Sequence, residues 1–447
     1  MASTYLTRTN GSAPTNTTKA TVSCWVKKSG LAQHQGIFGV RNTGNNNINV
    51  QCGFFNGKWY MWYKDGSTDY YLQDSTAQPR DLNGWYHVVF RFDTTQGAAA
   101  DRLRVYVNGQ DLGNSTFSTK SNPTSNDDVI IGTNGLEWSI GRYTFTGGSH
   151  NYFDGMISHF YYCDGYSYGP EYFGSTDATT GEWKFGGTGV INFGNNGFYV
   201  LKDGNSGTDQ SGNGNNLTVG GGTLTKTEDC PSNVFATWNP LWSASNGNVG
   251  DVTFTHGNTT TTTSSSYRTT PTTLGMSGSG KYYWEVKRNE TGSDTHFGVM
   301  SENATPANTA TWIGNAANGW ILAGDNGQVY TGGSAGSVLA NGAVGNGDIF
   351  MGAFDCSTGK LYFGVNGTWA GTANPTTGAN PHYTLDTSLT YFPVVSTGGD
   401  VTANFGNGYF GTTAVSSAGT NASNLGIFEY DVPTGFTALC TKGINSF

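Results

Sequence analysis

Short runs in which hydrophobic and polar residues alternate follow one another along most of the chain. The runs over residues 21–27 and 85–92 alternate in this way, so that every second side chain would face a core. The run over 103–107 leads directly into Asn108-Gly109, a dipeptide typical of tight β-hairpins. No segment has a convincing helical period. The pattern therefore predicts antiparallel strands packed as a sandwich.

The strand pattern stops and then restarts, which indicates two domains. New strand-like runs begin after about Trp238 and cover residues 280–286, 297–300, 347–355, 360–367, 392–395 and 401–406. The stretch before them is rich in Gly and Asn. We therefore expect an all-β protein with two antiparallel β-sandwich (jelly-roll) domains in tandem. Their predicted bounds are residues 1–185 and 237–447, with a Gly/Asn-rich connector over 186–236.

Composition narrows the classes of partner. Only 12% of the residues are charged, and the net charge is −9 with 22 Lys and Arg residues and no basic cluster. Neutralising phosphates requires clustered cations, so no nucleic-acid partner is expected. No stretch of about 18 apolar residues is present, so no membrane insertion is expected. Residues 1–12 show no signal peptide, and the six scattered cysteines are expected to be reduced thiols.

The motifs of common enzymes are missing or stand in the wrong context. Residues 275–281 have the GxxxxGK spacing of a phosphate loop, but Tyr282 follows and a strand begins where a helix is needed. The His residues show no zinc-binding spacing. Acids such as Glu137 and Glu285 have no identifiable partner, whereas glycoside hydrolysis needs two carboxylates about 5–10 Å apart. We therefore do not expect an enzyme.

Oxygen-bearing side chains recur at alternate positions near the start of the connector. Asp203, Asn205 and Asp209 could wrap a hard cation such as Ca²⁺. An EF-hand would need Gly and Glu where Thr208 and Gly214 stand, so an ordinary turn cluster is the alternative. Calcium is thus the one cofactor that the sequence leaves open.

An aromatic strand in the first domain is a candidate for ligand binding. The run over residues 59–63 is aromatic on both faces, and only one face is needed for a core. Tyr60 and Trp62 would line a shallow sugar-binding face, with Asp65 and Asn56 nearby. The alternative is that these aromatic side chains pack beneath a neighbouring loop.

The second domain carries aromatic and acidic side chains in or beside its predicted loops. The candidates there for contact with a glycan or a protein partner are Trp312, Trp320, Asp325 and Tyr330. Trp369 follows a predicted turn closely and is expected to be structural.

Several of these runs resemble known families. The runs 24–27, 85–88, 103–109 and 153–157 resemble, in order and spacing, the laminin-G/concanavalin-A-like jelly roll. Most members of that family are glycan- or protein-binding modules. The strand-like runs of the second domain resemble the SPRY domain, a β-sandwich that binds peptides or other ligands through its loops. Both resemblances imply a fold and a binding habit, and the SPRY family has no common catalytic activity.

The segments that join and follow the domains resemble proteins of tailed bacteriophages. Residues 196–203, 207–216 and 231–240 look like a connector of phage proteins, and residues 432–441 fit the same group. A lectin-like module followed by a SPRY-like one is similar to phage virion structural proteins. The resemblance implies a tail fibre or receptor-binding component that recognises host surface polysaccharide. It also implies contacts with other virion proteins and a homo-oligomer, with a trimer favoured.

Two alternatives stay open. Phage fibres usually carry an N-terminal anchor and a coiled-coil or β-helical shaft, and this sequence shows neither. This departure favours a capsid decoration protein (head fibre or cement) as the alternative. A polysaccharide depolymerase is the third interpretation, and it would require paired carboxylates beside the aromatic face. In each case we expect synthesis in the host bacterial cytoplasm and a final location in the virion.

Overall fold

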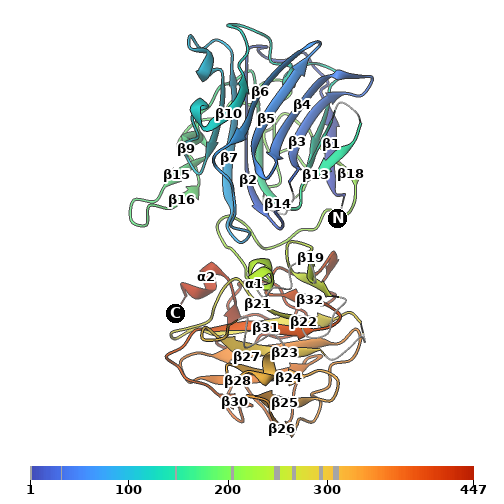
Figure 1. The fold of residues 1–447 in the computed structure, drawn as a ribbon, viewed down its shortest axis with the longest axis vertical. Coiled ribbons are helices and arrows are strands. Elements are labelled where there is room, and N and C mark those ends of the chain that lie inside the picture. Colours follow the sequence, from blue (N-terminus) through green and yellow to red (C-terminus); the bar gives the residue numbers. More distant parts are fainter. Residues whose placement is uncertain are drawn as a thin grey trace. The chain divides into compact units, whose positions relative to one another are not determined.

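The chain folds into two compact units. The computed structural model describes residues 3–31, 33–145, 148–202, 206–245, 252–263, 268–290, 295–305 and 312–446. One unit consists of residues 1–226 with 230–232, and the other of residues 227–229 with 233–447. Both are built from largely antiparallel sheets (Figure 1), which confirms the predicted all-β class.

The first unit is a sandwich of two sheets. The larger sheet has the strand order β10 (Phe117–Ser121), β6 (Thr68–Ser75), β5 (Lys58–Asp65), β4 (Asn45–Phe55), β3 (Gln35–Asn42), β11 (Glu137–Ile140), β1 (Tyr5–Thr9) and β18 (Thr218–Gly221). The smaller sheet has the order β17 (Phe198–Val200), β14 (Gly155–Asp164), β2 (Lys19–Lys28), β7 (Tyr86–Asp93), β8 (Leu103–Val107) and β9 (Gln110–Asp111). The tight hairpin predicted at Asn108-Gly109 joins β8 to β9.

The core of the first unit contains the apolar side chains that the alternating runs predicted. Val22, Cys24 and Val26 of β2 are completely buried between the sheets. Trp138 of β11 lies among them, with its ring centroid 4.5 Å from that of Tyr162. Because Trp removes a large apolar area from water, truncating such a side chain costs about 3–5 kcal/mol.

A hairpin crosses the outer face of the larger sheet, the face turned away from this core. It is formed by β12 (Arg142–Thr144) and β13 (His150–Tyr152). Two glycines of β3 make room for it, because a Cβ atom at Gly36 would lie 2.1 Å from the Tyr143 nitrogen, and one at Gly39 would lie 2.9 Å from the Tyr143 Cα. The hairpin therefore covers part of a face that a sandwich usually leaves to solvent.

A second hairpin, β15 (Gly174–Thr176) with β16 (Trp183–Phe185), covers a buried histidine of the smaller sheet. The indole nitrogen of Trp183 donates to Nδ1 of His87 at 3.0 Å, and Nε2 of His87 lies 2.8 Å from the Ser23 hydroxyl. Burial lowers the pKa of His87 to about 3. The ring is therefore neutral, with its proton on Nε2, and donates to Ser23.

The predicted connector folds mostly into the first unit. β17 pairs with β14 and β18 pairs with β1, so residues 186–226 add an edge strand to each sheet. The boundary between the units therefore lies at residues 227–233, rather than at 185 and 236. The Gly and Asn residues that suggested a linker serve turns between paired strands instead.

The second unit is also a sandwich. One sheet has the order β19 (Val252–Thr255), β20 (Thr260–Thr263), β32 (Asp400–Asn404), β22 (Lys281–Arg288), β27 (Ile349–Asp355), β28 (Lys360–Val365) and β29 (Thr368–Trp369), with β30 (Tyr383–Thr384) on β28 and β35 (Thr437–Ala438) on β22. The other has the order β21 (Arg268–Pro271), β31 (Tyr391–Thr397), β23 (His296–Ser301), β24 (Gly319–Ala323), β25 (Gln328–Thr331) and β26 (Ser334–Val338). In the core between them, the rings of Phe297 and Phe350 stack at 5.0 Å. The GxxxxGK segment leads into β22 and not into a helix, as the sequence indicated.

Glu285, an acid without an identifiable partner in the sequence, lies fully buried under the C-terminal segment. Its carboxylate accepts hydrogen bonds from the Tyr283 hydroxyl (2.9 Å), the Tyr430 nitrogen (2.9 Å), the Glu429 nitrogen (3.0 Å) and the Asn404 amide (3.1 Å). Burial raises the pKa of Glu285 to about 7, and these four donors oppose the rise. The residue holds the C-terminal segment on β22 and is a structural group.

The remaining elements are short. They are the α-helices α1 (Pro240–Ser245) and α2 (Thr441–Ile444), the strands β33 (Tyr409–Phe410) and β34 (Thr413–Ala414), and the 3-10 helices η1 (Ala99–Asp101), η2 (Asn114–Thr116), η3 (Ile130–Gly132), η4 (Pro170–Tyr172) and η6 (Ile313–Asn315). No helix among the described residues combines the length and the hydropathy of a membrane span.

Candidate functional site

The outer face of the larger sheet in the first unit carries two neighbouring aromatic side chains. Trp62 of β5 and Tyr71 of β6 are directly paired across the two strands, and both are half-buried. Trp59, Met61 and Tyr63 of the same strand point into the core. Because successive side chains of a strand alternate between faces, Trp62 must point outward.

Two carboxamide side chains continue the outer face beside Trp62. Gln51 of β4 pairs with Trp62, and Asn49 lies two residues further along the same strand. Both side-chain amides donate to the Thr144 carbonyl of the covering hairpin, at 3.1 Å from Gln51 and 2.7 Å from Asn49. Their own carbonyl oxygens are buried and receive no hydrogen bond within the described part of the chain. An unsatisfied buried acceptor costs about 1–3 kcal/mol, so a donor that entered beneath Thr144 would be bound favourably.

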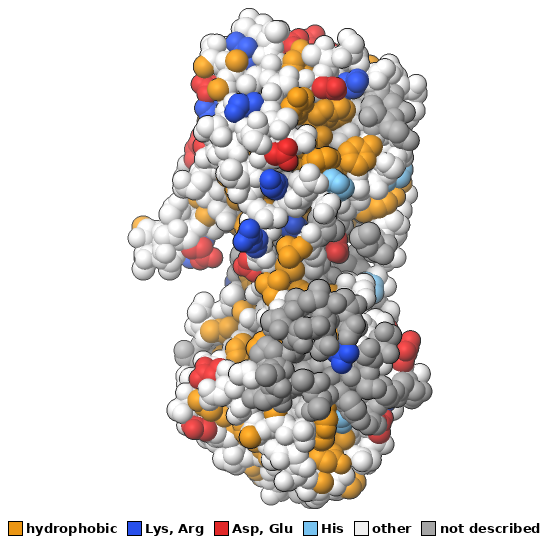
Figure 2. Space-filling view, viewed as in Figure 1, with side chains coloured by type: hydrophobic (Ala, Val, Ile, Leu, Met, Phe, Trp, Pro, Cys, Tyr) orange, Lys and Arg blue, Asp and Glu red, His pale blue; other side chains and the backbone are white. Residues whose placement is uncertain are grey.

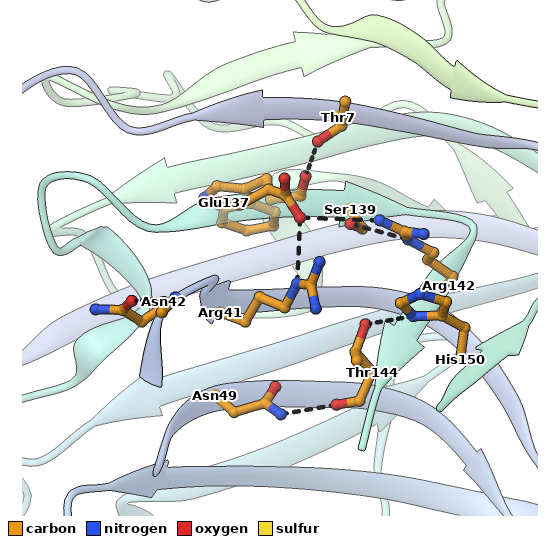
Figure 3. Close-up of polar contacts among 11 residues, drawn as sticks. Thr7, Arg41, Asn42, Asn49, Glu137, Ser139, Arg142, Thr144 and His150 are labelled. Carbon is orange, nitrogen blue, oxygen red and sulfur yellow. Dashed lines mark hydrogen bonds and ion pairs between the residues drawn. The ribbon is translucent and has the colours of Figure 1, made fainter. Parts of the chain in front are cut away.

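An ionic cluster lies next to the carboxamides. Arg41 of β3 pairs with Asn49 on one side and with Glu137 on the other. Its Nε donates to the Glu137 carboxylate at 3.2 Å, and Nη2 of Arg142 lies 3.8 Å from the same oxygen. Figure 3 shows the two arginine side chains approaching Glu137 from β3 and from the hairpin. Two guanidinium groups thus share one carboxylate, which leaves one positive charge in excess.

Arg142 and His150 are the two basic side chains of the hairpin strands, and neighbouring side chains hold both in place. The Arg142 guanidinium lies 3.5 Å above the centroid of the Tyr5 ring, and its Nε donates to the Ser139 hydroxyl at 3.2 Å. His150 Nδ1 lies 2.9 Å from the Thr144 hydroxyl. Burial lowers the pKa of His150, the positive charges of Arg142 and Arg41 lower it further, and Glu137 opposes them. The surroundings of His150 are therefore electropositive.

Tyr60 does not take part in this face as predicted. Its side chain is only 4% exposed, because it lies beneath the hairpin with its ring centroid 6.2 Å from that of Tyr143 and 5.3 Å from that of Phe55. Burial also raises the pKa of the Tyr60 hydroxyl. The alternative expected for this strand, packing beneath a neighbouring segment, thus applies to Tyr60 and not to Trp62.

Asn56 and Asp65 are exposed, but they lie at opposite ends of β5. At about 3.3 Å per residue they are about 30 Å apart, so they cannot contact one ligand ring together. Asn56 has a φ of 52° in the turn between β4 and β5, where it and Gly57 allow the tight hairpin. Its role is therefore in the turn.

The candidates of the second unit do not converge on one site. Trp320 packs toward the core, with its ring 5.6 Å from that of Tyr391, whereas Trp312 and Tyr330 contact each other at 5.1 Å on the opposite face of β24. The expectation of a common loop surface is wrong for Trp320, because alternation along β24 and β25 separates it from the other rings. Asp325 forms a 2.7 Å ion pair with Arg288, whose side chain is only 3% exposed.

The calcium candidates are only partly within the described residues. Asp203 and Asn205 lie outside them. Asp209 accepts hydrogen bonds from three backbone nitrogens, those of Tyr199 (2.9 Å), Ser211 (2.8 Å) and Asn215 (2.8 Å). Its carboxylate thus organises a turn, which is the alternative that the sequence left open. The described residues contain no cluster of three or more His, Cys, Asp or Glu side chains suited to a metal ion.

Sequence reasoning missed most of the side chains on this face. Strand alternation could have placed four of them on the outer face, away from the core: Arg41, Asn49, Gln51 and Tyr71. Their convergence could not, because it depends on the register in which the consecutive strands β3 to β6 pair and on the distant strand β11, which brings Glu137 beside Arg41. The same holds for the hairpin, whose position depends on Gly36 and Gly39.

Comparison with known proteins gives one family match, which lies within the first unit. Residues 1–165 match the family described as the concanavalin A-like lectin/glucanases superfamily. The chain has no significant match among curated proteins.

Three solved structures illustrate the likenesses of the fold. The SPRY domain of human HERC1 has 16% identity over 32% of this chain and 87% of its own, with a TM-score of 0.27. The SAP-like pentraxin of Limulus polyphemus has 18% identity over 36% of this chain and 70% of its own, with a TM-score of 0.26. Domain 4 of the GH43 arabinanase AbnA of Geobacillus stearothermophilus, solved with arabinotriose, has 21% identity over 34% of this chain and 64% of its own, with a TM-score of 0.26. At such scores these likenesses carry no argument about function. The family match of residues 1–165 is to concanavalin A-like lectins and glucanases, and it covers part of the first unit.

Proposed function

We propose that the first unit binds a glycan on the outer face of its larger sheet, at Trp62 and Tyr71. The observation that carries the proposal is the direct pairing of these two half-buried rings beside the polar side chains of Gln51 and Arg41. Sugar rings present apolar C–H faces that pack on aromatic side chains, while nearby polar groups fix their orientation. The match of residues 1–165 to a lectin and glucanase superfamily supports this assignment.

The test is binding of wild type and two alanine variants to a glycan array, followed by calorimetry with the strongest oligosaccharide. Trp62→Ala should weaken binding by about tenfold or more, because stacking on one aromatic ring is worth about 1–3 kcal/mol where it has been measured for planar ligands. Tyr71→Ala should weaken binding less, because the tyrosine ring offers a smaller apolar face than the indole. Tyr106→Ala is the matched control, since Tyr106 is a half-buried ring on the other sheet. Full affinity in Trp62→Ala, or no glycan bound by wild type, would refute the proposal.

We further propose that the protein is a structural component of a tailed-bacteriophage virion, as a tail fibre or receptor-binding subunit. Its support is the resemblance of residues 196–203, 207–216, 231–240 and 432–441 to phage proteins, together with the lectin-family match of residues 1–165. Repetition of weak glycan sites over a particle would raise avidity. A capsid decoration protein is the competing assignment.

Immunogold labelling of intact particles with antibody against this chain tests the virion proposal. Label on the tail is the expected result. Label spread over the head would favour capsid decoration, and particles without label would contradict a virion role altogether. Mass analysis of the purified protein in solution would measure the oligomer, for which a trimer is expected.

A further inference from the structure

Arg41 presents an unused hydrogen-bonding edge on the proposed glycan-binding face. Its Nε is bound to Glu137 at 3.2 Å, while its Nη1 and Nη2 make no hydrogen bond to another described residue. The side chain is 22% exposed, so this edge is open to solvent. A guanidinium oriented through one nitrogen is well suited to bind a planar carboxylate, because its remaining N–H groups match the two oxygens.

The local charge favours an anion. Arg41 and Arg142 share the single carboxylate of Glu137, and the next ion pair on the face, Lys64 with Asp69 at 3.6 Å, is neutral as a whole. The excess positive charge occurs in a chain whose net charge is −9. Arg142 is less accessible to a ligand than Arg41, because its side chain is only 7% exposed and lies against Tyr5.

Arg41 and Trp62 are close enough to contact one oligosaccharide. Trp62 lies in line with Gln51 and Gly39 across the sheet, and Arg41 is two residues beyond Gly39. Two strand spacings and two residues correspond to about 12 Å between their Cα atoms, a length that linked sugar rings can span. The buried carbonyl oxygens of Asn49 and Gln51 lie between the two positions and have no donor within the described residues.

We propose that the glycan bound on this face is an acidic polysaccharide, whose uronic acid carboxylate binds Arg41 while a neighbouring ring packs on Trp62. This inference rests on the proposed glycan-binding function and narrows it to one chemical class. Glu137 is a positioning residue, since it orients Arg41 and does not itself contact the carboxylate.

The experiment compares pairs of uronic acid oligosaccharides with the same oligosaccharides after reduction of each carboxylate to a primary alcohol. Galacturonate, mannuronate and glucuronate oligomers serve as probes, and calorimetry gives the affinities of the full chain. Wild type should bind at least one acidic oligomer about tenfold more tightly than its reduced form, the effect of a charge-assisted hydrogen bond. Arg41→Gln should lose this difference, and Arg41→Lys should keep only part of it, because an ammonium lacks the planar edge.

Arg80→Gln is the matched control, because Arg80 is exposed in the loop after β6, at the other end of the strands, and the same charge is removed. It should retain the preference of wild type. Thermal unfolding of each variant establishes that it is folded. The acidic class is wrong and the glycan site stands if wild type binds the acidic and reduced forms alike. The same conclusion follows if Arg41→Gln keeps the preference while Trp62→Ala still weakens binding. If wild type binds none of these oligomers but binds other glycans of the array, the acidic class alone is wrong. If no glycan of the array binds, or Trp62→Ala has no effect, both proposals fail.

Discussion

At the scale of single residues, some polar side chains are arranged like catalytic groups but have a structural role. Ser23 and His87 lie within hydrogen-bond distance, as a nucleophile and its base would. The Trp183 indole can only donate, so Nδ1 of His87 must be the acceptor nitrogen of the neutral ring. Nε2, which faces Ser23, then carries the proton and cannot act as a base toward the Ser23 hydroxyl. Ser23 and His87 therefore belong to a buried hydrogen-bond network beneath the β15–β16 hairpin, and their role is structural.

The burial of His87 predicts acid sensitivity of the first unit. A histidine whose native pKa, about 3, lies below its unfolded value stabilises the fold at neutral pH, and this contribution is lost as the pH falls below about 6.5. Between about pH 6 and pH 4, His87 should lower the unfolding free energy of the first unit by about 1.4 kcal/mol per pH unit. Urea unfolding of wild type and His87→Gln across this range measures the difference in slope. Equal slopes would mean that His87 takes up a proton in the native state.

At the scale of elements, the β12–β13 hairpin decides which part of the outer face is open. It buries Tyr60, Asn49 and Gln51 and leaves Trp62 half-exposed. Its docking depends on the missing side chains of Gly36 and Gly39. The sequence predicted the strands beneath the hairpin from their alternation, whereas nothing local in residues 142–152 indicates which strand they cover.

Gly36→Ala should therefore release the hairpin. The added methyl group would lie 2.1 Å from the backbone nitrogen of Tyr143, which cannot move aside as a flexible side chain can. The expected cost is about 1–3 kcal/mol, with faster amide hydrogen exchange over residues 142–152. Gly11→Ala serves as the control, because a Cβ atom there meets nothing within 4 Å. Unchanged exchange over the hairpin would show that the sheet accommodates the methyl group.

At the scale of the whole molecule, each unit has a core of its own, and the surface is poor in charge. In the view of Figure 2, Lys and Arg side chains lie scattered among uncharged ones, in keeping with a chain of which 12% is charged. Trp138 lies in the core of the first unit, and Trp284 lies in that of the second. The two cores share no residue, so a substitution in one should act on the unit that contains it.

Calorimetry of core variants tests this independence. Trp138→Ala should destabilise the first unit by about 3–5 kcal/mol and lower its unfolding temperature, while the transition of the second unit stays in place. Trp284→Ala is the reciprocal variant and should lower only the other transition. A single transition that shifts in both variants would mean that the units unfold cooperatively.

The sequence by itself determined the all-β class, two sandwiches, and the core residues of strands such as β2, because a strand repeats every two residues and burial follows that repeat. The tertiary structure alone decided the boundary between the units, since the pairing of residues 198–200 and 218–221 with distant strands is not a local property. It also decided which of two neighbouring aromatic candidates is accessible to a ligand. Tyr60 and Trp62 share a strand and a face, and only the hairpin above Tyr60 distinguishes a buried ring from an accessible one.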